Sequence, residues 1–191
     1  MIPLPLYIES IINAQMPGLS AIRASALAEA AMCCLMQNQH SSGVSVEVQS
    51  APNRVVNVNW LSQLTTEMER TWADPDEAAE DGAMALAILL AYVLKGHVVV
   101  QRSPKGTGFD YYACHVSKVG ENLSDPNRPF NFTKRLEVSG LFSQPDSAVQ
   151  ARLRIKIKQT AKHDNVYDVP ALIGIIEFGK PHMHLLERAA Q

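Results

Sequence analysis

The stretch ADPDEAAEDGAMALAILLAYVLKGHVVVQRS, residues 73–103, decides the fold, because it holds the most strongly predicted helix and the strand that follows it. Asp76 is a favourable N-cap, and acidic residues fill the first helical turn. Lys95 and Gly96 form a typical helix end. We therefore expect a helix over 76–95 and a strand over 97–103.

Downstream of this stretch the pattern continues as strand, strand, helix and strand. The turn PKGTG leads into FDYYACHV (109–116), and RLEVSGLF (135–142) is the next predicted strand. The segment SQPDSAVQARLRIKIKQTAKH (143–163) is ambiguous: RLRIKIK alternates like a strand, whereas PDSAVQA resembles a helix start. We prefer a helix, because the buried strand ALIGIIEFG (171–179) needs a crossover before it.

Upstream of this stretch the sequence predicts helices and a hairpin. Residues 4–38 favour helix, with Ser20 as an N-cap, and 61–72 resumes a helical pattern. Between them, GVSVEVQ (43–49) and RVVNVNW (54–60) alternate around the turn SAPN and predict a β-hairpin. The expected fold class is α/β in a single domain over 1–191: a mixed central sheet flanked by helices, with residues 1–72 as a helical and hairpin extension of a core over 73–191.

Composition narrows the class of protein. The 191 residues are 47% hydrophobic and 19% charged, which is enough to bury a core. The net charge of −2 gives no overall attraction to nucleic acid. The odd count of three cysteines argues against a disulfide framework and favours buried thiols in a reducing cytoplasm. The longest apolar run, 83–94, is too short to span a bilayer, and no signal peptide is visible, so we expect a cytoplasmic protein without a membrane partner.

Three acidic residues fall at positions that predict a shared site. Glu80 lies in the first turn of the helix, on the face of Met84 and Ile88 that we expect to look toward the sheet. Asp110 opens the second strand, and Glu137 lies inside the third, where an unpartnered glutamate is costly to bury. If these strands are neighbours, their carboxylates converge and suit Mg²⁺ or Mn²⁺. Such an ion can activate water and neutralise charge on a phosphate.

The order of these elements, with acids at these positions, resembles the PD-(D/E)XK, or restriction-endonuclease-like, nuclease superfamily over about residues 74–180. The resemblance implies an αβββαβ core. It matches Asp110 to the motif aspartate, Glu137 to the acid of the (D/E)XK element, and Glu80 to the acid found on the first core helix of many members.

The motif lysine departs from this pattern, because Ser139 stands two residues after Glu137. In the superfamily this lysine can move to a neighbouring element. Lys156, on the sheet-facing side of the predicted helix, is then the candidate, followed by Lys158 and Lys105. The resemblance implies metal binding by Asp110, Glu137 and Glu80, with Lys156 completing the catalytic set.

Each acid also has a structural interpretation. Asp110 can cap a turn, and Glu137 can form an ion pair with Arg135, Arg102 or a lysine of the next element. Glu80 can simply favour the helix dipole. The basic segment 152–162 is either a solvated face or a phosphate-contacting stripe.

Two further motifs are weaker. The turn PKGTG has a lysine and two glycines but lacks the spacing of a nucleotide-binding loop. In HMH, His182 and His184 share one face of any strand, which suits a transition metal, but no third ligand lies nearby in the sequence.

The sequence thus supports two hypotheses. The first is a Mg²⁺- or Mn²⁺-dependent phosphodiesterase acting on nucleic acid, with DNA as the default substrate by analogy. The second is a non-catalytic binding or assembly subunit of a bacterial or phage complex, which keeps the fold without the lysine. A homodimer or a protein partner is compatible with both.

Overall fold

The computed structural model describes residues 3–14, 16–119 and 133–190. Its centre is one eight-stranded mixed sheet. The strands, in spatial order, are β1 (Leu4–Tyr7), β3 (Arg54–Asn59), β2 (Val44–Gln49), β8 (His182–Arg188), β7 (Ala171–Glu177), β6 (Lys134–Leu141), β5 (Tyr111–His115) and β4 (His97–Arg102). The α-helices in these residues are α1 (Ser10–Asn13), α2 (Ala21–Gln37), α3 (Thr66–Thr71), α4 (Pro75–Lys95) and α6 (Asp146–Ala161). This arrangement confirms the α/β class.

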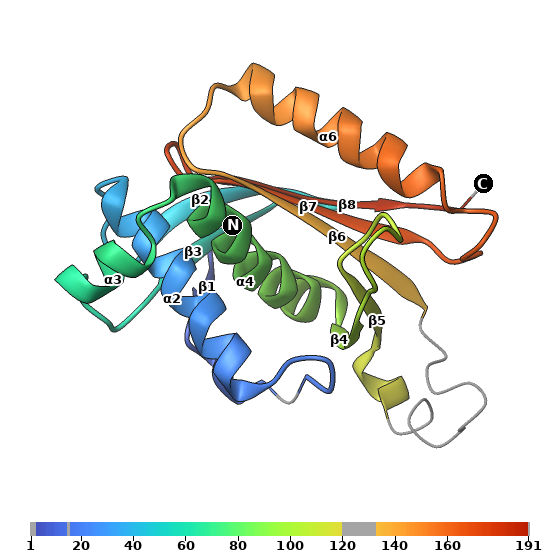
Figure 1. Cartoon of the computed structure of the whole chain (residues 1–191), viewed down its shortest axis with the longest axis horizontal. Helices are drawn as coiled ribbons and strands as arrows, with labels where there is room; N and C mark the ends of the chain where they lie inside the picture. The colour runs from blue at the N-terminus through green and yellow to red at the C-terminus, as the bar shows by residue number, and fades with distance from the viewer. Residues whose placement is uncertain (1–2, 15, 120–132, 191) are drawn as a thin grey trace.

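Helices cover both faces of the sheet (Figure 1). Helices α2 and α4 lie against one face and α6 lies against the other. Helix α4 is buried at Ala78 and Ala79 and again from Gly82 to Ala91, because it packs between the sheet and α2. Helix α6 buries much less, chiefly Val149 and Thr160, and most of its surface faces solvent. Three polar side chains of α6, Arg152, Lys156 and Gln159, form hydrogen bonds with Ser139 or Glu137 of β6.

The ends of α4 follow capping rules, with one correction to the expected N-cap. Asp74, rather than Asp76, is the N-cap, and its Oδ1 accepts the backbone N–H groups of Asp76 at 2.9 Å and Glu77 at 3.2 Å. Pro75 follows at the first helical position, where its missing N–H costs nothing. Gly96 ends the helix in the left-handed conformation at φ 65°, as expected.

The strands after α4 pair in chain order. β4 is antiparallel to β5, β5 is antiparallel to β6, and β6 is parallel to β7. Helix α6 makes the crossover between the parallel pair, so the helical interpretation of the segment around Asp146–Ala161 is confirmed. The β5–β6 register places Tyr111 opposite Leu136, and the next pair outward is therefore Asp110 and Glu137.

The N-terminal segment differs in part from expectation. Leu4–Tyr7 was expected to be helical but forms β1, which lies parallel to β3 at the edge of the sheet. Four residues are too few to show the alternating hydrophobic pattern of a strand, and this strand forms by pairing with a distant segment. The hairpin β2–β3 is confirmed, and β2 lies parallel to β8 through the pair Val48 and Met183. The N-terminal strands therefore extend the central sheet.

All three cysteines are buried and free of disulfide bonds. Within these residues, no helix has both the length and the apolar character needed to cross a membrane.

Candidate functional site

Asp110 and Glu137 lie at the point where β5 and β6 separate. The backbone N–H of Asp110 donates to the carbonyl of Leu136 at 2.8 Å, and Tyr111 then begins β5. β6 continues past this point, and the N–H of Val138 donates to Asp110 Oδ2 at 2.9 Å. The aspartate side chain thus accepts a hydrogen bond that a neighbouring strand would otherwise accept. This local role fixes the carboxylate beside Glu137.

The Glu137 carboxylate is buried and held by α6. Its side chain is only 3% exposed, and its Oε1 accepts hydrogen bonds from Lys156 Nζ and from Gln159 Nε2, the latter at 3.0 Å. Gln159 Nε2 also donates to the carbonyl of Gly108 at 3.2 Å, which ties the β4–β5 turn to the same helix. Lys156 and Gln159 occupy one face of α6 at a three-residue spacing. The predicted contact between the Glu137 strand and Lys156 is present.

The pKa of Glu137 reflects these opposing influences. The net pKa is about 7, against an ordinary value of 4.5, because burial raises it most and the negative charge of Asp110 raises it as well. The Lys156 ammonium and the Gln159 amide oppose the rise by stabilising the carboxylate. A cation bound near both acids would favour the charged form, so binding of a metal ion at this position would release a proton from Glu137 near neutral pH.

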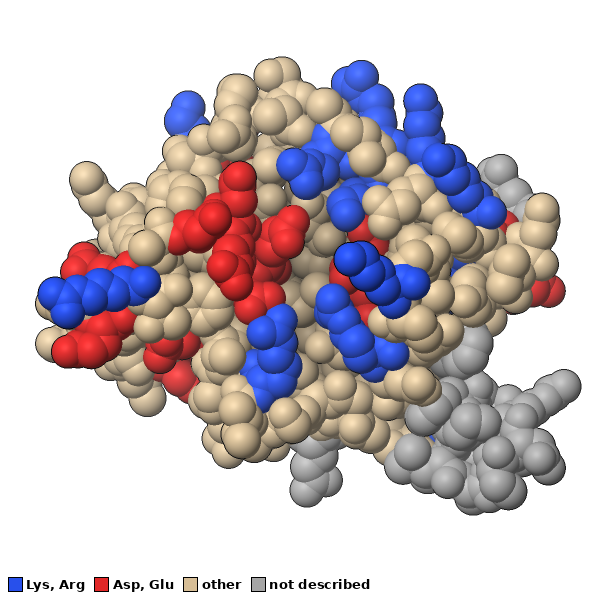
Figure 2. Space-filling view, in the orientation of Figure 1, with Lys and Arg blue, Asp and Glu red and all other residues tan. Residues whose placement is uncertain are grey.

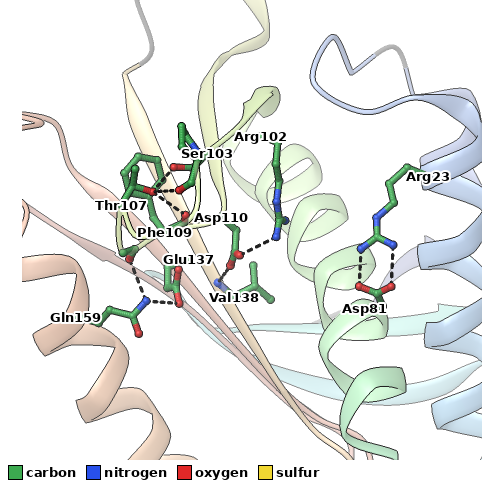
Figure 3. Close-up of polar contacts among 12 residues, drawn as sticks. Arg23, Asp81, Arg102, Ser103, Thr107, Phe109, Asp110, Glu137, Val138 and Gln159 are labelled. Atoms are coloured by element: carbon green, nitrogen blue, oxygen red, sulfur yellow. Dashed lines mark hydrogen bonds and ion pairs between the residues drawn. The ribbon is translucent and has the colours of Figure 1, made fainter. Parts of the chain in front are cut away.

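Asp110 is balanced by an exposed arginine. Arg102 Nη2 lies 3.3 Å from Asp110 Oδ1, and the guanidinium lies 4.8 Å from the centroid of the Tyr111 ring. The side chains of Arg102 and Asp110 are 53% and 21% exposed. Figure 3 shows Asp110 directed toward Arg102 and the Val138 amide, and Glu137 directed toward Gln159. The pair is open to solvent, so Arg102 can leave Asp110 at little cost.

Asp110, Glu137 and Lys156 line one open pocket of about 690 Å³. Its cationic lining residues are Arg102, Lys105, Lys156 and Lys162, against the two acids. The lining therefore has four cationic side chains and two acidic ones, although the whole chain has a net charge of −2. Two carboxylates inside a cationic rim suit a polyanion bound together with a metal ion.

Glu80 lies in a neighbouring pocket. It is exposed near the start of α4 and lines a hollow together with Asp76, Gly140 and Arg152. The backbone of α4 lies very close to β6 here, since a Cβ on Gly140 would overlap the carbonyl of Ala79. The structure thus brings Asp110, Glu137 and Lys156 into one pocket and places Glu80 outside it, in a hollow that contacts β6 at Gly140.

Neighbouring polar residues complete the α6–β6 contact. Arg152 Nη1 donates to Ser139 Oγ at 3.0 Å, so Ser139, two residues after Glu137, contacts the same helix as Glu137. Arg135 does not pair with Glu137; it is fully buried and its Nη2 lies 2.6 Å from Asp164 Oδ1. Sequence reasoning missed Gln159, whose only signal was its position one turn beyond Lys156.

The other candidates lie apart or at the rim. Lys105 lines the pocket, whereas Lys158 is exposed on the outer side of α6. His182 and His184 share a face of β8, with ring centroids 5.7 Å apart. They do not line the pocket of Asp110 and Glu137.

The carboxylates of Asp110 and Glu137 fit a hard cation that takes its remaining ligands from water or from a substrate phosphate. Among residues 3–14, 16–119 and 133–190, no group of three or more His, Cys, Asp and Glu side chains is arranged to hold a metal ion. Mg²⁺ is commonly bound by one or two carboxylates, with waters or substrate phosphates completing its shell. Asp110 and Glu137 supply that number of carboxylates.

Comparison with known proteins adds no assignment. No family model matches the chain, and no curated protein sequence matches it significantly.

Proposed function

We propose that the protein is a metal-dependent phosphodiesterase that hydrolyses nucleic acid, with DNA as the first substrate to test. The observation that carries the proposal is the meeting of Asp110, Glu137 and Lys156 in one open, cation-rimmed pocket. Metal-dependent hydrolysis of a phosphodiester uses groups that bind the metal ion and a cation near the developing charge, and these three side chains would provide both.

The order of elements supports a PD-(D/E)XK-like core. From α4 to β7 the chain runs helix, three strands, helix, strand, with antiparallel, antiparallel and parallel pairings. Helices α4 and α6 lie on opposite faces of the sheet (Figure 1). Asp110 and Glu137 fall at the positions that the resemblance assigns to the two motif acids.

Each residue then has a chemical role. Asp110 and Glu137 would hold Mg²⁺ or Mn²⁺, which when bound supplies Lewis acidity and an activated water. Lys156, which contacts Glu137 from α6, is placed to orient the attacking water and to offset negative charge on the phosphate. Glu80, in the adjoining pocket, would act through a water or a second ion.

The proposal is tested by cleavage of labelled DNA and RNA with Mg²⁺ and with Mn²⁺. We expect cleavage by the wild type and its loss in Asp110→Asn, Glu137→Gln and Lys156→Met. Asp81→Asn is a matched control, because Asp81 is also 21% exposed and also pairs with an arginine, Arg23 (Figure 3). Cleavage that survives Glu137→Gln would refute the assigned site.

A second function is favoured by the ion pairs themselves. Both acids already have cationic partners, Arg102 and Lys156, as in a purely structural network. On this interpretation the protein is a binding or assembly module with a nuclease-like fold, and its partner is a second copy or another protein. Absence of cleavage under any metal, together with a dimer in sedimentation or binding of a purified partner protein, would support this alternative.

A further inference from the structure

The basic segment after Asp146 divides into an inner and an outer row. The inner pair, Arg152 and Lys156, is half-buried and contacts β6. The outer row is Arg154, Lys158 and Lys162, which are all exposed. Positions four apart lie on one face of a helix and are separated by about 6 Å along its axis. The outer row therefore forms a continuous cationic line, which we call the α6 track.

The α6 track has no acidic neighbours that neutralise it. Within the described residues, none of its three side chains forms an ion pair, and Asp146 is the only acid in α6. Its last member, Lys162, also lines the pocket of Asp110 and Glu137. The track therefore leads from the solvent-facing side of α6 directly to the candidate site.

The opposite approach to the site is acidic. Asp74, Asp76, Glu77 and Glu80 are all exposed around the first turns of α4, and we call them the acidic end of α4. Asp76 and Glu80 face Arg152 across the neighbouring pocket. Figure 2 shows Lys and Arg side chains gathered over the α6 side of this face and Asp and Glu side chains gathered over the α4 side.

We propose that the backbone of the bound nucleic acid runs along the α6 track into the pocket, and that the acidic end of α4 closes the other approach. This inference rests on the proposed function and adds the path of the substrate. Exposed charges act over about 8–10 Å at ordinary salt, so the track attracts phosphates locally despite the net negative charge. Phosphate contacts of this kind position a polynucleotide without reading its sequence.

The test is equilibrium binding of a labelled DNA duplex and its single strand to the full chain, with Ca²⁺ in place of Mg²⁺, over a range of KCl concentrations. The track variant is Arg154→Gln with Lys158→Gln, both outside the pocket. The matched control is Arg70→Gln with Lys180→Gln, which removes two exposed cations from α3 and from the β7–β8 turn.

Two lost phosphate contacts lower the salt slope by about 1.8, so between about 50 and 200 mM salt the wild type should lose roughly 12-fold more affinity than the track variant. The control pair should keep the wild-type slope. Asp76→Asn with Glu77→Gln should instead tighten binding by about twofold at low salt, whereas Glu47→Gln on β2 should not.

The outcomes separate the two proposals. If the wild type binds and the track variant keeps its slope, the path is wrong while the proposed function stands. If the wild type binds neither form of DNA, and an RNA of the same sequence is not bound either, both proposals fail. If the track and control variants weaken binding equally, the attraction is diffuse and the α6 track is refuted.

Discussion

Glu137→Gln should change how the stability of the protein depends on pH. The glutamate is almost fully buried, and its pKa in the folded state is raised to about 7 by burial and by Asp110, against an ordinary value of 4.5. Between these two values the folded state holds a proton that the unfolded state has released. The free energy of unfolding therefore falls as the pH rises through this range.

The size of the effect follows from the two pKa values. Between pH 5 and pH 8 the wild type should lose about 2–3 kcal/mol from this group alone, at roughly 1.4 kcal/mol per unit of pKa difference. Glutamine does not titrate, so Glu137→Gln lacks this loss. Other titrating groups are common to both proteins and largely cancel in the comparison.

Urea unfolding at pH 5 and pH 8, without divalent ions, measures the difference. The wild-type midpoint should fall by about 1 M more than that of the variant, for a urea dependence of roughly 2–3 kcal/mol per molar. Asp81→Asn is the control, because it removes a carboxylate outside the pocket and should track the wild type. If the midpoints of wild type and Glu137→Gln shift in parallel, Glu137 has an ordinary pKa and its assignment as a poised ligand is wrong.

Three more substitutions test other parts of the structure. Asp110→Asn should change the free energy of unfolding by less than about 1 kcal/mol, because asparagine can still accept the hydrogen bond from the Val138 amide and the ion pair with Arg102 is exposed. The same substitution should abolish Mn²⁺ binding. A large destabilisation in urea would mean that Asp110 is structural. Lys156→Met should raise the pKa of Glu137 above about 7, because it removes a positive charge that stabilises the carboxylate. The pH profile of Mn²⁺ affinity should then move to higher pH. An unchanged profile would show that Lys156 does not act on Glu137. Gly140→Ala should destabilise the protein by about 3 kcal/mol in thermal unfolding, because a Cβ there overlaps the Ala79 carbonyl, and a neutral result would disprove the close approach of α4 to β6.

Much of the core could be predicted because its signals are local. The capped, apolar helix α4, the valine-rich strand β4 and the uniformly apolar strand β7 each carry their pattern within a few residues. The crossover requirement then decided the ambiguous α6. The pairing of β5 with β6 follows from chain order, and it brings Asp110 opposite Glu137.

What the sequence could not reveal depends on long-range pairing. The residues of β1 favour helix and those of β8 carry no strand signal in the sequence, because each strand forms by pairing with distant segments: β1 pairs with β3, and β8 pairs with β2 and β7. The N-cap is Asp74, whereas the sequence predicts Asp76; both residues are acidic and flank Pro75, so the sequence does not distinguish them. Gln159 was missed because an amide on an exposed-looking helix gives no sign of a buried partner.

The most direct test is calorimetric titration of Mn²⁺ and Mg²⁺ into the wild type and into Asp110→Asn with Glu137→Gln, with Asp81→Asn as the control. We expect the wild type and the control to bind, and the double variant to lose binding, because Asp110 and Glu137 supply the carboxylates of the pocket. Equal binding by the wild type and the double variant would contradict the proposed metal site. If the wild type binds no metal ion, with or without DNA, the only role left for Asp110 is to accept the hydrogen bond from the Val138 backbone amide.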